Sequence, residues 1–181
     1  MAMTENGVTT TNTPGTEQYE TFTRKTRGKT KRYYQYDYRH YDGKLFSCIK
    51  PTLEQCRNER DRWLKKEEIL RIIAHAHGSD KYYKFSPFDG YPVITDGVHS
   101  LAKATGCYWL LDIIGSYQSN KRLDPKFQVW KLEVNDDDRA VVRGYNDTDL
   151  IITQKISYTD FPLKEIKLYL IDGVILLPSE Y

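Results

Sequence analysis

The chain has 181 residues, of which 39% are hydrophobic and 29% are charged, and its formal net charge is +2. These values are ordinary for a soluble protein with one domain and a small accessory unit, and no apolar run approaches the roughly 18 residues that span a bilayer. The first six residues form neither the basic leader nor the apolar core that a secretory signal uses, and we therefore expect a cytoplasmic protein.

Charge is distributed unevenly along the chain. Residues 24–66 carry 14 Lys and Arg against 5 Asp and Glu, whereas residues 67–181 carry 13 against 17. The near-neutral total therefore combines a basic segment with an acidic one, and such asymmetry points to partners rather than to a fold. We expect a basic unit at 19–66, with a polyanion as its partner, and a second domain at 67–181.

The first predicted elements are a tail and a hairpin. Residues 1–18 consist mainly of Thr, Asn, Gly, Pro and Glu, which bury too little surface to offset the entropy of ordering, so we predict a disordered tail. Three tyrosines recur with the period of two of a strand between residues 31 and 39. The Asp42-Gly43 pair predicts a turn, and residues 45–49 predict the returning strand.

A helix follows the hairpin. Thr52 and Gln55 fit a capping box, and apolar residues at helical spacing follow to the mid-60s, which gives a small ββα unit. The helical pattern resumes over 67–76. Periodicity alone leaves open whether residues 52–76 form one helix or two.

An aromatic loop is predicted over residues 79–95, where turn-forming Pro and Asp-Gly pairs interrupt core-sized side chains. We expect this loop to fold onto the domain and to offer a protein-binding surface. The residues of that surface are Tyr82, Tyr83, Phe85 and Phe88.

The remainder of the chain predicts helices and then strands. Asp96 caps a short helix that Gly106 ends, and a second helix carries apolar residues from Leu110 to Tyr117 on one face. Short connections between the following strands favour an antiparallel meander of about five strands with the helices on one face, an α+β fold. The predicted strands are 127–134, 140–145, 150–158, 166–171 and 174–177, and the third places Leu150 and Ile152 on one face.

Few side chains suggest a metal or a cofactor. The cysteines Cys48, Cys56 and Cys107 form no C-x-x-C pair, which indicates neither a disulfide framework nor a zinc knuckle. His75 and His77 are close in sequence, but residues at i and i+2 do not share a helix face, and a histidine at a helix C-terminus also interacts favourably with the dipole. We expect reduced thiols, no metal and no cofactor.

Two aspartates leave an enzymatic alternative open. Asp112 lies in an otherwise apolar helical segment, where a carboxylate can acquire a raised pKa and act as an acid or a base. Such a residue is more often partly exposed or hydrogen-bonded. We therefore expect a protein that is not an enzyme, with an acidic site around Asp96 and Asp112 as the alternative.

The basic segment is the stronger functional signal. Positive side chains bind the nucleic-acid backbone by releasing counterions, and tyrosines and arginines stack on bases or bond to phosphates. In the alternative interpretation, the same charges only solubilise a small unit with a tyrosine core. The predicted nucleic-acid footprint is Arg27, Lys29, Lys31, Arg32, Arg39, Lys44 and Lys50. The following helix adds Arg57, Arg60 and Arg62.

Motifs in each half carry a family resemblance. In the first half they are Tyr33–Arg39 (YYQYDYR), Asp42–Cys48 (DGKLFSC) and Arg60–Leu64 (RDRWL). With these motifs, residues 19–64 resemble a family of short uncharacterised proteins carried by bacterial conjugative elements. The order of strand, turn, strand and Thr-led helix also resembles the small DNA-binding domains of tyrosine integrases, whose third strand would come from residues 19–26.

The second half carries the motifs Thr95–Val98 (TDGV), Tyr108–Asp112 (YWLLD), Ser116–Gln118 (SYQ), Tyr158–Leu163 (YTDFPL) and Leu177–Tyr181 (LPSEY). With them, residues 81–181 resemble another uncharacterised family from bacteria, phages and mobile elements. The two resemblances imply mobile-element biology and no catalytic residue.

These observations favour one function and leave two alternatives. The first hypothesis is a non-enzymatic accessory protein of a mobile genetic element, whose basic unit binds DNA or RNA and whose second domain binds a protein, with no membrane partner. The second is a protein-binding antagonist of a host defence system, in which the acidic domain competes for a cationic surface. The third is the enzyme with the acidic site.

Overall fold

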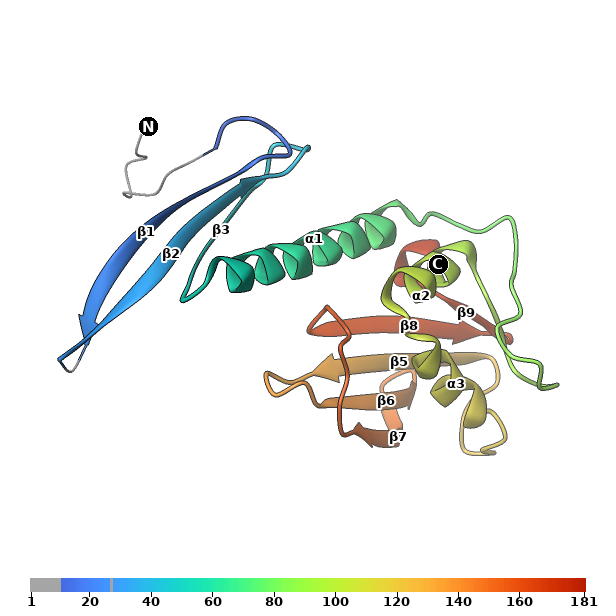
Figure 1. The fold of residues 1–181 in the computed structure, drawn as a ribbon. Coiled ribbons are helices and arrows are strands. Elements are labelled where there is room, and N and C mark those ends of the chain that lie inside the picture. Colours follow the sequence, from blue (N-terminus) through green and yellow to red (C-terminus); the bar gives the residue numbers. More distant parts are fainter. Residues whose placement is uncertain (1–10, 27) are drawn as a thin grey trace. The chain divides into compact units, whose positions relative to one another are not determined.

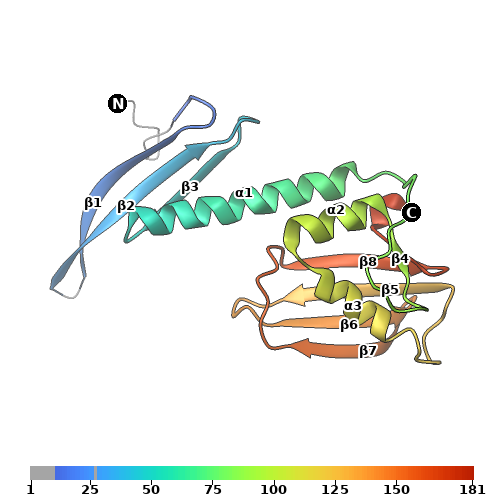
Figure 2. The ribbon, with the colours of Figure 1, turned by 45° about the vertical axis from the view of Figure 1, so that its right-hand side comes forward.

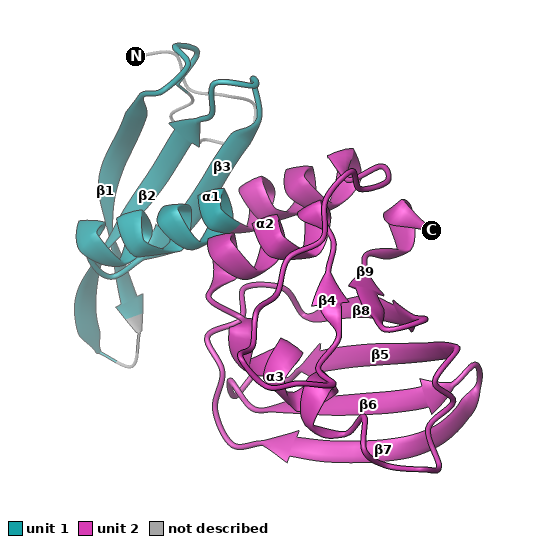
Figure 3. Ribbon diagram, turned by 90° about the vertical axis from the view of Figure 1, so that its right-hand side faces the viewer, with its two compact units in different colours: residues 1–65 teal, residues 66–181 magenta. Residues whose placement is uncertain are grey.

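The computed structural model describes residues 11–26 and 28–181, and the chain divides into two compact units (Figure 3). Unit 1 comprises residues 1–65 and unit 2 comprises residues 66–181. The division lies next to the point where the basic segment gives way to the acidic one. Helices and largely antiparallel sheets occur in succession, so the predicted α+β class is confirmed.

Unit 1 contains a three-stranded antiparallel sheet in the order β1-β2-β3 (Figure 1). The strands are β1 (Glu17–Thr26), β2 (Lys29–Arg39) and β3 (Leu45–Lys50). β2 and β3 form the predicted hairpin. β1 is a third strand that the ββα prediction lacked, because Tyr19 and Phe22 are its only large apolar side chains. It lies where the resemblance to integrase domains placed a third strand.

The predicted disordered tail is wrong for residues 11–18. Thr11 is buried, and the N–H of Gly15 donates to the carbonyl oxygen of Arg39 at 2.8 Å, which ties this segment to the end of β2. Backbone hydrogen bonds therefore position this segment, although its composition offers little apolar surface to bury. Residues 1–10 of the predicted tail lie outside the described residues.

One continuous helix, α1 (Leu53–His75), follows the sheet, so the segment 52–76 contains one helix and not two. Thr52 caps its N-terminus, as one half of the predicted capping box, because Thr52 Oγ1 accepts a hydrogen bond from the N–H of Gln55 at 3.2 Å. α1 begins in unit 1 and ends in unit 2. The core of unit 1 consists of Tyr36, Tyr38 and Cys56, with Phe46 and Trp63 packed against them.

Unit 2 contains a six-stranded sheet in the order β4-β9-β8-β5-β6-β7 (Figures 2 and 3). β4 (Val93–Ile94) pairs in parallel with β9 (Val174–Leu176), and the other pairs of neighbours are antiparallel. The remaining strands are β5 (Phe127–Val134), β6 (Ala140–Asn146), β7 (Asp149–Ile156) and β8 (Glu165–Ile171). The ends of the five predicted strands agree with these bounds within two residues.

The sheet is a meander only from β5 to β7. β8 does not pair with β7 but lies on the other side of β5. The connection from β7 to β8 buries Phe161 and Leu163, and the N–H of Thr159 donates to the carbonyl oxygen of Asp138 at 2.7 Å. This connection is therefore part of the core. It does not form a turn between paired strands, although its short length suggested one.

Two helices, α2 (Asp96–Thr105) and α3 (Tyr108–Ser116), cover one face of the sheet (Figure 1). α2 ends at Gly106 as predicted, but its N-cap is Thr95 and not Asp96. A short 3-10 helix, η1 (Pro178–Glu180), lies near the C-terminus. The core between helices and sheet includes Val98, Leu101, Ile114, Trp130 and Leu168. Across residues 11–26 and 28–181, none of the helices has both the length and the apolarity to cross a membrane.

An irregularity in β7 moves one predicted core residue to the surface. Tyr145 pairs with Leu150 while Gly144 pairs with Ile152, so Ile151 is an extra residue on β7. Ile152 is therefore 6% exposed whereas Leu150 is 50% exposed. The prediction that Leu150 and Ile152 share a face is wrong.

Candidate nucleic-acid interface

The N-terminal part of the basic segment lies in a two-stranded ribbon at one end of the sheet of unit 1. β3 pairs with β2 only between Tyr34 and Arg39, whereas β1 pairs with β2 along its whole length. The outer part of the β1–β2 hairpin therefore extends beyond β3 (Figure 1). We call residues 22–26 and 28–33 the cationic ribbon.

The charged side chains of the cationic ribbon are all basic. They are Arg24, Lys25, Lys29, Lys31 and Arg32. All five are exposed, and none makes an ion pair or a side-chain hydrogen bond with another described residue. The sequence contains no acidic residue between Glu20 and Asp37. Arg27, which the sequence also predicted as a contact, lies outside the described residues.

Like charges and aromatic rings share one face of the ribbon. Arg24 is the register partner of Lys31, and like charges directly opposite each other destabilise a sheet. Two residues along, Phe22 and Tyr33 stack with 5.8 Å between ring centroids. Because residues two apart on a strand share a face, this aromatic pair lies beside Arg24, Lys31 and Lys29.

The other residues of the predicted footprint lie outside the ribbon and are engaged elsewhere. Arg39 donates two hydrogen bonds to backbone carbonyl oxygens, at 2.7 and 3.1 Å. Lys44 Nζ lies 4.0 Å from Asp42 Oδ2, and Lys50 Nζ donates to Glu59 Oε1 at 3.1 Å. The structure therefore does not bring the predicted residues into one site. The predicted footprint did not include Arg24 and Lys25 of the cationic ribbon, because β1 was not assigned.

Two of the helix arginines join α1 to β1. Arg57 Nη2 and Arg60 Nη1 donate to the carboxylate of Glu17 at 2.5 and 2.8 Å, and Arg60 also donates to the Tyr36 hydroxyl at 2.9 Å. The hydrogen bond from Arg57 lowers the pKa of Glu17, and burial raises the pKa of Tyr36. Arg62 is exposed and lies 3.6 Å from an acidic neighbour on the helix. Arg57 and Arg60 are therefore structural contacts.

The predicted protein-binding residues divide into two pairs. Tyr83 stacks on His99 with 4.1 Å between ring centroids, and Phe85 packs against the core of unit 2. Tyr82 and Phe88 are 60% and 68% exposed. Only this second pair is largely open to a partner, and its role in binding a protein stays a prediction.

The two aspartates of the enzymatic alternative have different surroundings. The carboxylate of Asp96 accepts hydrogen bonds from the Tyr83 hydroxyl at 2.6 Å and from Ser79 Oγ at 3.0 Å. The bond from Tyr83 lowers the pKa of Asp96, which makes this carboxylate a weaker base. Asp112 is exposed on α3, outside this contact. The arrangement at Asp96 is that of a contact between the aromatic loop and α2.

Glu180 joins two of the sequence motifs of unit 2. Its carboxylate accepts hydrogen bonds from Thr95 Oγ1 at 2.6 Å, from the N–H of Leu177 at 2.9 Å and from the N–H of Gly97 at 3.0 Å. A Cβ at Gly97 would lie 2.7 Å from Glu180 Oε1, so the close approach requires glycine. Sequence reasoning missed this contact, although it had named both motifs, because spacing does not show that they meet.

The described residues offer no evident metal centre. Within residues 11–26 and 28–181, no group of three or more His, Cys, Asp or Glu is placed to hold a metal ion. His75 Nδ1 lies 2.8 Å from the carbonyl oxygen of Arg71. The three cysteines are free thiols, and burial raises the pKa of Cys48 to about 12 and also raises that of Cys107.

Two families match the chain. The family of unknown function DUF6876 matches residues 67–181, and a domain of unknown function, B. Theta Gene description (DUF3873), matches residues 1–68. The chain therefore belongs to the family DUF6876 and carries a second domain of unknown function before it. No curated protein and no solved structure matches the chain. The predicted fusion of two uncharacterised families is thus confirmed, while neither description mentions a mobile element.

Proposed function

We propose that unit 1 binds nucleic acid through the cationic ribbon. The observation that carries the proposal is the combination of charge and shape, since five exposed cations without acidic neighbours lie on a two-stranded hairpin that extends beyond β3. The major groove of duplex DNA admits a two-stranded β-ribbon. Lys and Arg side chains there gain affinity from the counterions that they displace from phosphates.

The repulsion inside the ribbon supports the same proposal. Arg24 and Lys31 lie directly opposite each other, so the protein alone carries an unfavourable contact. A polyanion bound across the ribbon would offset this repulsion. A surface that only solubilises the unit has no need to place two cations opposite each other.

Phe22 and Tyr33 extend the proposal to unpaired strands. Their stacked rings lie beside Arg24 and Lys31, and aromatic rings next to cations form a platform on which bases stack, worth about 1–3 kcal/mol per base. We expect the ribbon to bind duplex and single-stranded nucleic acid. The variant Phe22→Ala should weaken binding of single strands by about tenfold and leave duplex binding nearly unchanged.

A gel-shift titration of the full chain at low salt tests the proposal. The probes are a DNA duplex of about 20 base pairs and a single strand of the same length. The variant Arg24→Gln, Lys31→Gln, Arg32→Gln should bind both probes at least about tenfold more weakly, because three phosphate contacts are lost. The matched control Lys103→Gln, Lys121→Gln, Lys155→Gln removes the same charge from exposed positions of unit 2.

Two outcomes would contradict the proposal. Equal weakening in the ribbon variant and in the control would indicate that net charge, and not the ribbon, governs binding. A wild-type chain that shifts neither probe would remove the nucleic-acid function. The ribbon variant also relieves the repulsion between Arg24 and Lys31, so we expect it to be no less stable than the wild type. Weaker binding by this variant would then not result from loss of folding.

The wider roles stay predictions. An accessory role in a mobile element, antagonism of a host defence system and a cytoplasmic location are named by neither family description. The proposal for the ribbon does not depend on any of them.

A further inference from the structure

The sheet of unit 2 has an edge that is only partly covered. β8 begins at Glu165, but β9 pairs with it only at Tyr169, Leu170 and Ile171. Within the described part of the chain, residues 165–168 therefore have a strand neighbour on the β5 side alone. An edge with unpaired backbone N–H and C=O groups is a template for a further strand.

The direction of these backbone groups follows from the turn between β8 and β9. The Asp172-Gly173 pair has φ values of 47° and 82°, the geometry of a two-residue hairpin turn, which closes on a hydrogen-bonded pair, here Ile171 and Val174. Every second residue of an antiparallel strand directs its backbone groups to the same side. Counted back from Ile171, Lys167 and Glu165 direct theirs to the open edge.

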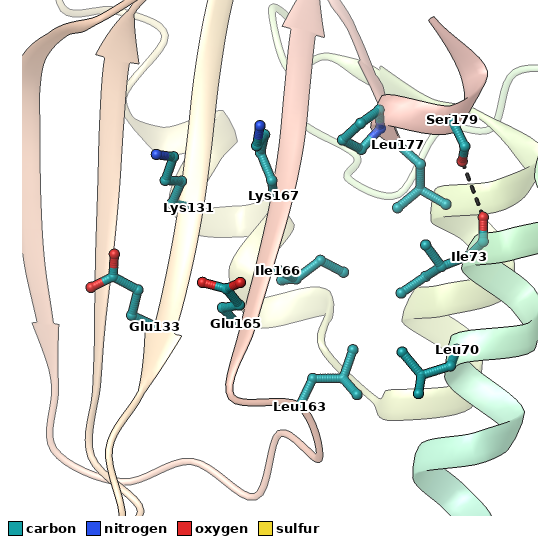
Figure 4. A pocket seen from close by; sticks show the side chains of 11 residues that line it. Leu70, Ile73, Lys131, Glu133, Leu163, Glu165, Ile166, Lys167, Leu177 and Ser179 are labelled. Carbon is teal, nitrogen blue, oxygen red and sulfur yellow. Dashed lines mark hydrogen bonds between the residues drawn. The ribbon is translucent and has the colours of Figure 1, made fainter.

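A groove of about 500 Å³ runs along this edge (Figure 4). Leu70 and Ile73 of α1 face it from the side opposite β8, and Leu163, Ile166 and Leu177 add apolar side chains. Leu70 is 42% exposed although it is apolar. The volume lies within the roughly 300–1,000 Å³ that is typical of ligand sites.

The charges that line the groove form two like-charged pairs. Lys131 is the register partner of Lys167, and Glu133 is the register partner of Glu165, so the lysines lie toward one end and the glutamates toward the other (Figure 4). Glu133 is paired with Arg143. Neither Glu165 nor Lys167 makes an ion pair with a described residue, and these two carry the open backbone groups.

We propose that this groove binds an extended peptide segment of another protein, added as a strand along β8. Alternate apolar side chains of the peptide would contact Leu70 and Ile73. The side chains between them would place an acidic group beside Lys167 and a basic group beside Glu165, two residues apart. In such added strands, main-chain hydrogen bonds supply affinity and the side-chain contacts supply specificity.

A second copy of the chain is a poorer occupant. Two β8 edges paired antiparallel about Ile166 would also match Glu165 with Lys167 in charge. However, β5 lies beside β8 in every copy. A second copy that paired its β8 with this edge would therefore bring its own β5 into the space that Leu70 and Ile73 border. A single strand from a peptide has no such neighbour.

Selection of a displayed library of random peptides of about 12 residues on the full chain tests the proposal. Enriched peptides should alternate apolar and polar residues and carry opposite charges two residues apart. For the most enriched peptide, made synthetically, Leu70→Arg should lower the affinity at least about tenfold by filling the groove. Lys167→Pro should do the same, because it removes the N–H at the open edge and none that bonds to β5.

The controls separate charge, backbone and general surface effects. Lys167→Gln removes only the charge and should cost less affinity than Lys167→Pro, while Leu150→Arg, on β7, should change the affinity by less than about twofold. If Lys167→Pro does not fold, Leu70→Arg decides. Absence of enrichment, enriched peptides without alternation, or full binding by Leu70→Arg would overturn the proposal. A dimer that Leu70→Arg dissociates would overturn it in favour of a second copy.

Discussion

At the scale of single residues, Glu180 shows how a polar contact holds unit 2 together. Its carboxylate accepts three hydrogen bonds, from Thr95 and Gly97 at the start of α2 and from Leu177 before η1. All three partners are donors, and an amide in place of the carboxylate would set a donor against a donor. We expect Glu180→Gln to lower the free energy of unfolding by about 1–3 kcal/mol.

Urea denaturation of the two proteins measures this loss. Asp112→Asn is the matched control, because it makes the same chemical change at an exposed carboxylate and should alter stability by less than about 0.5 kcal/mol. Equal effects of the two variants would show that the Glu180 contact contributes little.

Arg39 is expected to differ from the ribbon residues although the sequence grouped them together. Its guanidinium donates to two backbone carbonyl oxygens near the end of β2. Arg39→Gln should therefore lower the stability of unit 1 by about 1 kcal/mol and leave nucleic-acid affinity within about twofold of wild type. Hydrogen exchange of β2 amides and the gel-shift titration measure the two effects. A large loss of nucleic-acid affinity without a loss of amide protection in β2 would indicate that Arg39 contacts the nucleic acid.

Glu17 should make the stability of unit 1 depend on pH. The hydrogen bond from Arg57 holds the pKa of Glu17 below its ordinary value of 4.5. Because the folded pKa is the lower one, this stability is fully present above the unfolded pKa and is lost as the pH falls through the folded pKa. Amide protection in β1 should therefore differ between wild type and Glu17→Gln above pH 4.5, and the two should converge as the pH falls below that value. A difference that stays constant over this range would contradict the assignment.

At the scale of elements, hydrophobic patterns predicted much of unit 2. In the strand from Phe127 to Val134, apolar residues alternate with charged ones from Trp130 onward, and the predicted bounds match β5. Pattern did not predict β1, because most of its side chains are polar and its hydrogen bonds to β2 define it as a strand. Nor did it predict the place of β8, because the core contacts of Phe161 and Leu163 in the preceding connection depend on tertiary structure.

The irregularity in β7 gives a direct test at this scale. Ile152 is buried and Leu150 is half exposed, although two residues separate them and a regular strand would place both on one face. We expect Ile152→Ala to lower the free energy of unfolding by about 2–4 kcal/mol and Leu150→Ala by less than about 0.5 kcal/mol. Thermal or urea denaturation compares the two. Equal losses would mean that β7 is regular in solution.

At the scale of the whole molecule, the charge boundary in the sequence, the division into two units and the two family matches fall near the same residues. Composition could predict this division because the net charge of each segment can be counted from the sequence without knowledge of the fold. It could not separate the ribbon from the other cations of unit 1, because only the pairing of β1 with β2 shows which cations lie beyond β3.

The helix α1 makes charge variants better probes than truncations. It runs from unit 1 into unit 2, and Ile69, in its second half, is fully buried in the core of unit 2. A cut at residue 66 would leave this half of the helix without its first turns. Binding experiments on the two units therefore need the full chain.

The salt dependence of affinity tests the central claim most directly. Each cation that contacts a phosphate of duplex DNA contributes about 0.9 to the slope of log K against log salt. For the full chain on a duplex of about 20 base pairs, we expect a slope of magnitude about 3–4.5, and we expect Arg24→Gln, Lys31→Gln, Arg32→Gln to reduce it by up to about 2.7. A wild-type slope near zero, or the same slope in the variant and the wild type, would contradict binding through the cationic ribbon.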